Sequence, residues 1–394
     1  MDNEVTKYFK RFTKDEISTI LGYFEQEIPK KAKKDELVNL VSDFIGGHPA
    51  DWLFRLPERD IRLLRTLCDA GPENWVPMES PEYPSVVAIL GLIYIDDSQS
   101  DKVMATLDSS LYFPVASIIN QVIKDKENDG SFRTERMALG LLNIYGAIPV
   151  DDFVETIFDM YDDHETGRDI VLAMAECPII SVNRMAYKDD VFIVSPYAYD
   201  YESIIDGRSE FEEIKEYPVF SKETVIEAGV SSPYCAFKNE EYEAVRNVLE
   251  TLGLQEGEIR KEIHNIWLNS QFAADEDSAE EMFRCINDKI DEIESFDTYR
   301  HFIDIVAAYA NSVPKWLLKG ATANDAGLLQ LSIKVDESMM EDVDTDDDAE
   351  QAEEQGPLKE FYKYNMAVRH VGPDDPCPCG SGLSYCHCHG KRLN

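Results

Sequence analysis

The chain has 394 residues, 44% of them hydrophobic, so it is long enough for two or three domains with ordinary hydrophobic cores. Its 77 acidic and 38 basic residues give a formal net charge of −39, which disfavours broad, non-specific binding to nucleic acids and anionic membranes. The first residues lack the basic and apolar regions of a signal peptide, and the longest apolar run, residues 86–95, is about half a membrane span. We therefore expect a soluble protein in the reducing cytoplasm, with four scattered cysteines in its core: Cys68, Cys177, Cys235 and Cys285.

Residues 1–58 are expected to be helical. Thr13 followed by Glu16 predicts a capping box at the start of a helix, whose apolar residues then follow helical spacing. A basic run at residues 30–34 precedes a second helix, which the glycines and proline of residues 46–49 should end. Two short helices around a basic turn are loosely similar to SAP-type nucleic-acid modules. We prefer the interpretation of a helical hairpin that packs on the residues after it.

Residues 59–207 are expected to alternate helices with short strands. A helix is predicted at residues 60–70 and an apolar element at 86–95, followed by a polar turn at 96–100. Three helices should then run through residues 132–145, 153–161 and 166–176, with a tight turn at 146–149. Two strands, at 179–186 and 191–195, complete the segment.

Three helices followed by a β-hairpin is the order of a winged helix, whose third helix often lies in the DNA major groove. In this chain the third helix and the residues before it are acidic, with Arg168 as the single basic residue. Phosphates would repel such a helix. The segment therefore predicts a winged-helix-like interaction scaffold that does not contact DNA.

Residues 208–335 are expected to be all-helical, with helices that begin near Asn239, Glu256, Ser278 and Phe296. His264 and His301 occur singly in these helices, and His164 occurs singly in a polar turn. We expect all three to pack or face solvent and not to bind a metal. Pro314 should break a helix next to a buried Trp316, and Thr322 with Asp325 should start a new one.

Residues 336–357 are expected to be a linker. Eleven of the nineteen residues from 336 to 354 are acidic and none is basic, so the segment should repel itself and bury no core. The acidic spacing resembles an EF-hand loop, but Asp347 stands where that loop needs glycine, so a calcium site is not expected. A short aromatic helix is predicted at residues 358–370.

The final residues of the chain concentrate metal-binding side chains. Four of the eight cysteines lie between positions 377 and 388, and histidines stand at 387 and 389. Thiolates and imidazoles at this density suit a tetrahedral zinc ion, and the glycines at 380 and 382 let the chain reverse after the first pair. The sequence therefore predicts a Zn²⁺ site that folds the tail. Four protein ligands would leave no open position for catalysis.

The same residues, from Asp375 to Gly390, resemble the SEC-C motif, which ends the bacterial translocase ATPase SecA and many other bacterial proteins. The resemblance covers about the last twenty residues. It implies four zinc ligands: Cys377, Cys379, Cys388 and His389. Cys386 and His387, which stand where the family usually has lysines, are also chemically competent, so they stay open as alternative ligands.

The predicted fold is mainly α: a multi-domain helical body with a winged-helix-like segment and short β-hairpin, an acidic linker and a small zinc tail. Its expected boundaries are residues 1–58, 59–207, 208–335, 336–357 and 358–394.

No nucleotide-binding loop, nucleophile elbow or metalloprotease helix occurs, so we expect a non-enzymatic adaptor. The resemblance implies that the tail docks a protein partner, a SecB-type chaperone or the ribosome, through residues such as Tyr385 and Lys391. The alternative hypothesis is a nucleic-acid-binding regulator that uses the winged-helix-like region and the basic run at 30–34.

Overall fold

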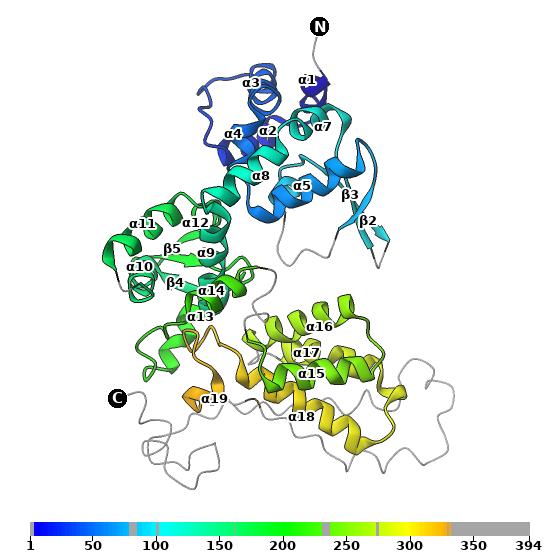
Figure 1. The fold of residues 1–394 in the computed structure, drawn as a ribbon, viewed down its shortest axis with the longest axis vertical. Helices are drawn as coiled ribbons and strands as arrows, with labels where there is room; N and C mark the ends of the chain where they lie inside the picture. The colour runs from blue at the N-terminus through cyan, green and yellow to red at the C-terminus, as the bar shows by residue number, and fades with distance from the viewer. Residues whose placement is uncertain are drawn as a thin grey trace. The chain divides into compact units, whose positions relative to one another are not determined.

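The structure is a computed structural model, and it describes residues 4–78, 85–99, 102–161, 163–230, 237–272, 276–328 and 331. It is mainly helical, as the sequence predicts, and it contains two three-stranded sheets (Figure 1). None of the helices in these ranges is long and apolar enough to cross a membrane. The chain divides into two compact units, described separately below; the domain boundaries expected from the sequence stay a prediction.

The N-terminal unit comprises Met1–Ala138 and Asp163–Arg184, and it includes the first half of helix α9. Its elements, in chain order, are α1 (Glu4–Phe9), α2 (Lys14–Tyr23), α3 (Lys34–Gly47), α4 (Pro49–Leu53), α5 (Glu58–Ala70), β1 (Val76–Met78), α6 (Val86–Ile89), β2 (Tyr94–Gln99), β3 (Lys102–Thr106), α7 (Ser109–Ala116), α8 (Ile119–Asn128), α9 (Ser131–Tyr145), α11 (His164–Ala175) and α12 (Pro178–Val182).

The C-terminal unit comprises Leu139–Asp162 and Met185–Asn394. Its elements after α9 are β4 (Ala147–Pro149), α10 (Val150–Asp159), β5 (Arg184–Tyr187), β6 (Asp190–Val194), α13 (Tyr201–Gly207), η1 (Arg208–Glu210), α14 (Lys222–Ala228), α15 (Glu240–Thr251), α16 (Glu256–Asn269), η3 (Ser270–Phe272), α17 (Glu276–Asp288), η4 (Ile290–Glu292), α18 (Phe296–Ser312) and α19 (Ala323–Ala326).

The helices of residues 1–58 form as predicted. Thr13 Oγ1 accepts from the backbone N–H of Glu16 at 3.2 Å, and Glu16 Oε2 accepts from the N–H of Thr13 at 2.6 Å, which completes the capping box. The apolar faces of α2 and α3 enter one hydrophobic core that continues to Phe132. α3 ends at Gly47, and after His48 the proline at position 49 starts α4.

The first sheet, of order β1-β3-β2, corrects one expectation. The polar turn predicted at residues 96–100 is wrong, because β2 continues to Gln99. β2 pairs with β3, and the register shifts between Asp96 and Gln99, so an irregular ladder accommodates the polar residues. Backbone pairing in the sheet therefore outweighs the turn preference of the side chains.

The second sheet has the order β4-β6-β5, and Ala147 pairs with Val194. The strand predicted at residues 179–186 is wrong in its first half, which forms helix α12; strand β5 begins only at Arg184. Pro178 stands at the first helical position, which suits its fixed φ. The hydroxyl of Ser181 and the amide of Asn183 then donate to helix carbonyls at 3.0 and 2.8 Å.

The helices of the C-terminal unit begin near the predicted residues, with Asn239 capping α15 and Phe296 opening α18. His264 packs between the rings of Tyr197 and Trp267, and burial lowers its pKa to about 4. His301, like His164 of the N-terminal unit, is exposed. The packing and solvent roles expected for these histidines are confirmed.

Trp316 is fully buried, as predicted. Its own indole and the side chains of Lys315 and Arg208 hold this segment in place through hydrogen bonds. Its indole N–H donates to the carbonyl of Asn143 at 2.9 Å, and Lys315 Nζ donates to the carbonyl and hydroxyl oxygens of Ser270 at 3.0 and 2.9 Å. Arg208 donates to four oxygens: those of the carbonyls of Tyr145, Ala147 and Trp316 and that of the Tyr217 hydroxyl. We call Arg208, Lys315 and Trp316 the tryptophan clasp. Gly146, at φ +73°, lies so close to the indole that no Cβ would fit.

Candidate functional site

The predicted zinc ligands, Cys377, Cys379, Cys388 and His389, lie outside the described residues, as do Cys386, His387 and the acidic linker. Within the described ranges, no group of three or more histidine, cysteine, aspartate or glutamate side chains could hold a metal ion. The scattered cysteines Cys68 and Cys177 are buried, as expected; Cys285 is half-buried, and Cys235 is not described.

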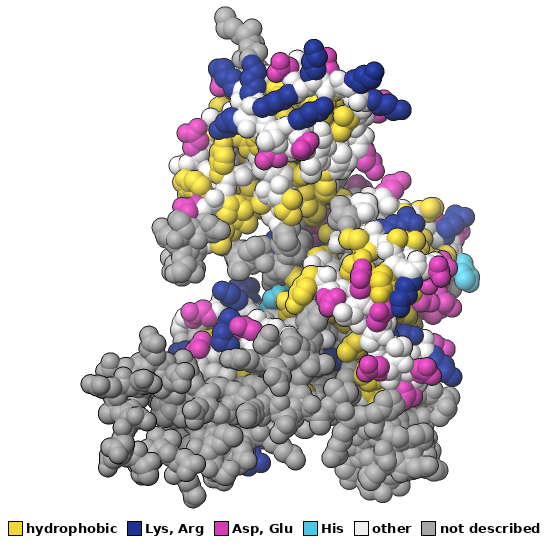
Figure 2. Space-filling view, turned by 180° about the vertical axis from the view of Figure 1, so that it is seen from behind, with side chains coloured by type: hydrophobic (Ala, Val, Ile, Leu, Met, Phe, Trp, Pro, Cys, Tyr) yellow, Lys and Arg dark blue, Asp and Glu magenta, His cyan; other side chains and the backbone are white. Residues whose placement is uncertain are grey.

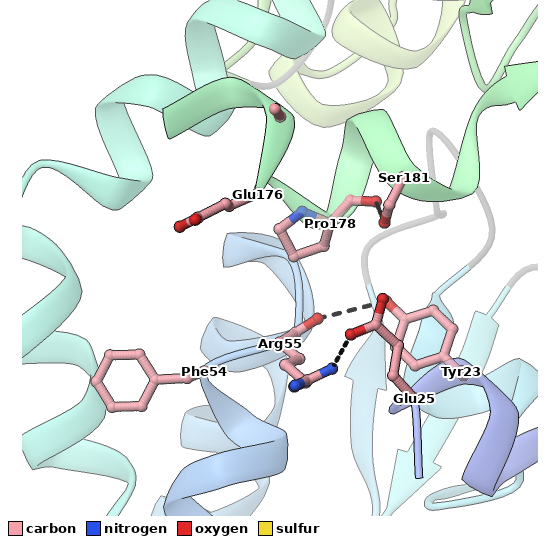
Figure 3. Close-up of a pocket in the computed structure, with 8 residues that line it drawn as sticks. Tyr23, Glu25, Phe54, Arg55, Glu176, Pro178 and Ser181 are labelled. Carbon is pink, nitrogen blue, oxygen red and sulfur yellow. Dashed lines mark hydrogen bonds and ion pairs between the residues drawn. The ribbon is translucent and has the colours of Figure 1, made fainter. Parts of the chain in front are cut away.

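The N-terminal unit contains a pocket of about 480 Å³, which we call the Phe54 pocket (Figure 3). Its walls come from the ends of α2 and α4 and from the α11–α12 junction. Arg55 Nη1 donates to Glu25 Oε2 at 2.6 Å and to the carbonyl of Phe24 at 3.2 Å. The lining residues are Tyr23, Glu25, Phe54, Arg55, Ala175, Glu176, Pro178 and Ser181.

A second pocket of about 200 Å³, the Glu135 pocket, shares three lining residues with the first: Phe54, Glu176 and Pro178. Its other lining residues come from the end of α8, the start of α9 and the α11–α12 junction. They are Lys126, Asp129, Ser131, Thr134, Glu135, Ala173 and Cys177. Since the pockets share a wall, they lie next to each other on this unit, and we call the pair the hollow.

Lys126 is a buried cation in the lining of the Glu135 pocket, only 3% exposed. Its ammonium donates to the carbonyls of Phe54 and Leu56, each at 3.1 Å, just beyond the C-terminus of α4. A cation at a helix C-terminus is favourable, so these bonds stabilise the unit. Burial lowers the pKa of Lys126, and the nearby Glu135 opposes that shift.

Glu135 is 4% exposed, and its Oε1 accepts from the backbone N–H of Glu58 at 2.7 Å, at the N-terminus of α5. Its other oxygen, Oε2, is buried and accepts no hydrogen bond within the described residues. Burial raises the pKa of Glu135 to about 7, although Lys126 and the Glu58 N–H lower it. This side chain therefore exchanges its proton near neutral pH.

A thiol and a second carboxylate act on Glu135. Burial raises the pKa of the Cys177 thiol to about 12, and Glu135 adds to the shift, so the thiol stays protonated. The Glu58 carboxylate is held by Arg62 at 2.7 Å and by Arg136 Nε at 2.6 Å. The arrangement suits ligand or proton binding.

The N-terminal unit also carries a strongly basic surface. The carbonyl of Lys10 accepts from Lys34 Nζ at 3.1 Å, which joins two basic runs far apart in the sequence. Figure 2 shows dark blue side chains gathered on this part of the unit. We call the set the N-terminal basic surface: Lys7, Lys10, Arg11, Lys14, Lys30, Lys31, Lys33 and Lys34. Among the described residues, its ion pairs include Lys7 with Glu4 and Arg11 with Asp108.

Sequence reasoning missed Lys126 and Glu135, although their helices carried a signal. Lys126 follows Ile119 and Val122 on the apolar face of α8, and Glu135 follows Phe132 on that of α9. A charged residue at a buried helical position is unusual and needs a partner. That pattern can point to Lys126 and Glu135 as candidate site residues, but it does not predict what they bind.

The described part of the chain is thus a mainly helical protein of two units, with a lined hollow and a basic surface on the first. No protein-family model and no solved structure matches it. A 47-residue stretch is 49% identical to the protein translocase subunit SecA of Bordetella petrii, in the C-terminal region of SecA. The match covers 12% of this chain and 4% of that protein, so it is a likeness between short segments.

Proposed function

We propose that this protein is a non-enzymatic adaptor of the cytoplasm whose C-terminal, SEC-C-like tail binds zinc and docks a protein partner. The short match to the SecA C-terminal region carries the proposal, because the metal-binding residues of this chain are concentrated at that end. By the same resemblance, the partner is a SecB-type chaperone or the ribosome, and Tyr385 and Lys391 are candidates for the contact surface.

Zinc would be held by Cys377, Cys379, Cys388 and His389, a set of three thiolates and one imidazole that suits a closed tetrahedral site. Such a site supplies folding energy to a segment too short for its own core. Cys386 and His387 are the competing ligands.

The C-terminal unit supports the adaptor proposal by giving the tail a fixed base. Asn311 of α18 accepts from the N–H of Leu331 at 2.8 Å and donates to its carbonyl at 2.9 Å. Leu331 is the last residue that the structure describes, and Lys315 and Trp316 of the tryptophan clasp lie shortly before it in the chain. A partner held by the tail would therefore be connected to a well-packed unit.

The chain order α9-β4-α10-α11-α12-β5-β6 and the sheet order β4-β6-β5 support the proposal of a winged-helix-like scaffold, with the short helix α12 as an addition before the hairpin. The first turn of α11 is acidic, with Asp163 as its N-cap. We assign this region to protein contacts because phosphates would be repelled from such a helix.

Metal analysis of the purified full-length protein tests the zinc site. Wild type should contain stoichiometric zinc under reducing conditions, and Cys388→Ser should lose it. Cys386→Ser is the matched control, since it removes a thiol two residues away. Zinc retained by Cys388→Ser and lost from Cys386→Ser would reassign the ligands, and metal-free wild type would refute the site.

Docking is tested separately by sedimentation with ribosomes and by size-exclusion chromatography with a SecB-type chaperone. The full chain should associate with one of them, and Cys377→Ser with Cys379→Ser should not. Equal association by both proteins would exclude the tail as the docking element.

The N-terminal basic surface supports a second candidate function, nucleic-acid binding. Lys34 bonds to Lys10, so the structure brings the basic residues at 7–14 and the run at 30–34 together on a chain with net charge −39. Lys14 and Lys34 also stand at the first positions of α2 and α3, where the helix dipole disfavours a cation. Helix stability therefore does not explain their presence, and a polyanion would.

Binding to duplex DNA or RNA at several salt concentrations tests this function. Replacing Lys31, Lys33 and Lys34 by alanine should lower the slope of log affinity against log salt by about two to three, since each phosphate contact contributes roughly 0.9. The exposed lysines Lys124, Lys215 and Lys261 form the matched control triple. Equal slopes for both triples would refute the surface as a nucleic-acid site.

A further inference from the structure

We propose that the Phe54 and Glu135 pockets together bind an organic cation, an alkylammonium or alkylguanidinium group, on the N-terminal unit. This activity goes beyond the adaptor function and does not depend on the zinc tail.

The two pockets have suitable sizes for such a ligand. The Phe54 pocket, at about 480 Å³, falls within the range of roughly 300–1,000 Å³ that small-molecule sites occupy. The Glu135 pocket, at about 200 Å³, has the volume of about seven waters at roughly 30 Å³ each. A ligand of moderate length could therefore place its charged group beside Glu135 and its stem beside Phe54.

The cations in the lining are already engaged. Lys126 donates to the carbonyls of Phe54 and Leu56, and Arg55 is paired with Glu25 at 2.6 Å (Figure 3). These bonds go to oxygens of the protein itself, so neither side chain is held in place by a group inside the pocket. An anionic ligand would have to displace one of these bonds, which is costly for a buried cation.

One carboxylate of the lining, that of Glu135, has an oxygen without a hydrogen bond within the described residues. Glu135 Oε2 is buried and accepts no hydrogen bond within the described residues, and an unsatisfied buried acceptor costs free energy. Asp129 and Glu176 add two exposed carboxylates at the edge of the same pocket. A positively charged ligand is attracted both by Glu135 and by the carboxylates at the edge.

The rest of the lining suits the stem of the ligand. Phe54 is 37% exposed and forms part of both pockets, and Pro178 lies in the same shared wall. An aromatic face attracts ammonium and guanidinium groups, and both residues offer apolar surface to an alkyl chain. The charged groups that act on Glu135 are Lys126 of α8 and Glu58 and Asp60 of α5, with the Cys177 thiol nearby.

Isothermal titration calorimetry of the full-length protein with butylguanidinium tests the proposal. A ligand of this size should bind with a dissociation constant on the order of 1 mM. Because a cation binds the ionised form of Glu135, affinity should rise about fivefold between pH 6 and 7, reach about tenfold by pH 8 and level off above it. Butylurea, the neutral isostere, and butyrate should bind at least about tenfold more weakly.

Glu135→Gln should weaken butylguanidinium binding at least about tenfold at pH 8 and abolish its pH dependence, because the amide does not titrate. Glu176→Gln should weaken binding severalfold and keep the pH dependence, while Glu155→Gln on the C-terminal unit should change nothing. Melting curves check that each variant folds. The peptide acetyl-Gly-Arg-Gly-amide distinguishes sources: tighter binding than butylguanidinium indicates a partner's side chain, and weaker binding a free amine. Undetectable butylguanidinium binding, equal butylurea binding or unchanged affinity in Glu135→Gln overturns the proposal.

Discussion

The Glu135 pocket of the N-terminal unit and the tryptophan clasp of the C-terminal unit arrange buried charge in different ways. In the N-terminal unit, Lys126 and Glu135 carry opposite charges beside a pocket, and one carboxylate oxygen has no hydrogen bond within the described residues. In the C-terminal unit, the hydrogen bonds of Arg208 and Lys315 go to carbonyl and hydroxyl oxygens around Trp316. A cation surrounded by fixed oxygens holds one arrangement, whereas Glu135 keeps one carboxylate oxygen without a hydrogen bond within the described residues. The comparison separates a structural use of buried charge from one available for binding.

Trp316→Ala gives the largest expected effect on this comparison. The substitution removes a fully buried indole, and with it the bond to the Asn143 carbonyl, so the C-terminal unit should lose about 4 kcal/mol of unfolding free energy. Hydrogen exchange in peptides of that unit measures the loss. Trp75→Ala is the matched control: Trp75 lies in the N-terminal unit and is 48% exposed, so it should cost less than about 1 kcal/mol. Similar losses for both would show that the clasp does not hold its unit together.

Lys315→Met comes second and tests the pH dependence of the clasp. Burial lowers the pKa of Lys315 from about 10.5 when unfolded to about 7 when folded. The unfolded chain therefore binds more protons between these values, so the unfolding free energy rises with pH from 7 to 10; lowering the pH from 10 to 7 removes this gain, and below 7 the effect levels off. Between pH 7 and pH 10 this rise in the unfolding free energy is about 3 kcal/mol, and Lys315→Met should remove it. Hydrogen exchange at pH 7 and pH 9 measures the slope; an unchanged slope would contradict the assignment.

Glu135→Gln is third and should have the opposite sign in the N-terminal unit. The pKa of Glu135 is about 7 when folded, against about 4.5 when unfolded. Because the folded state binds more protons between these values, the unfolding free energy falls as pH rises from 4.5 to 7. Relative to wild type, the variant should therefore gain about 2 kcal/mol between pH 5 and pH 8. Urea denaturation of both proteins at pH 5 and pH 8 measures this gain. If the variant were instead more stable relative to wild type at pH 5 than at pH 8, the predicted direction would be wrong.

The sequence predicted the parts of this comparison that depend on local patterns. Apolar spacing and the Thr13 cap placed the first helices, and the break at Pro314 placed Trp316 in the core. It did not predict that Arg208 would reach the carbonyl of Trp316, which is 108 residues away, because no local pattern encodes such a distance. The interaction of Lys126 with Glu135 likewise depends on how two helices pack and not on a local sequence pattern. The zinc ligands, inferred from spacing and resemblance, stay a prediction.

Glu25→Gly should have the smallest effect and addresses the wall of the Phe54 pocket. Glu25 has φ +54°, in the left-handed region that favours glycine, so the substitution should gain about 1 kcal/mol from the backbone. It also removes the ion pair with Arg55, which is largely exposed and contributes about 0.5 kcal/mol. The unfolding free energy should therefore change by less than about 1 kcal/mol, and Glu25→Ala, which keeps the strain and loses the pair, should be less stable than Glu25→Gly by about 1 kcal/mol. Urea denaturation of both variants tests this difference. If this difference is found, the strained backbone of Glu25 in the wall of the Phe54 pocket does not increase stability. That result is expected of a residue whose charge has a use in the pocket.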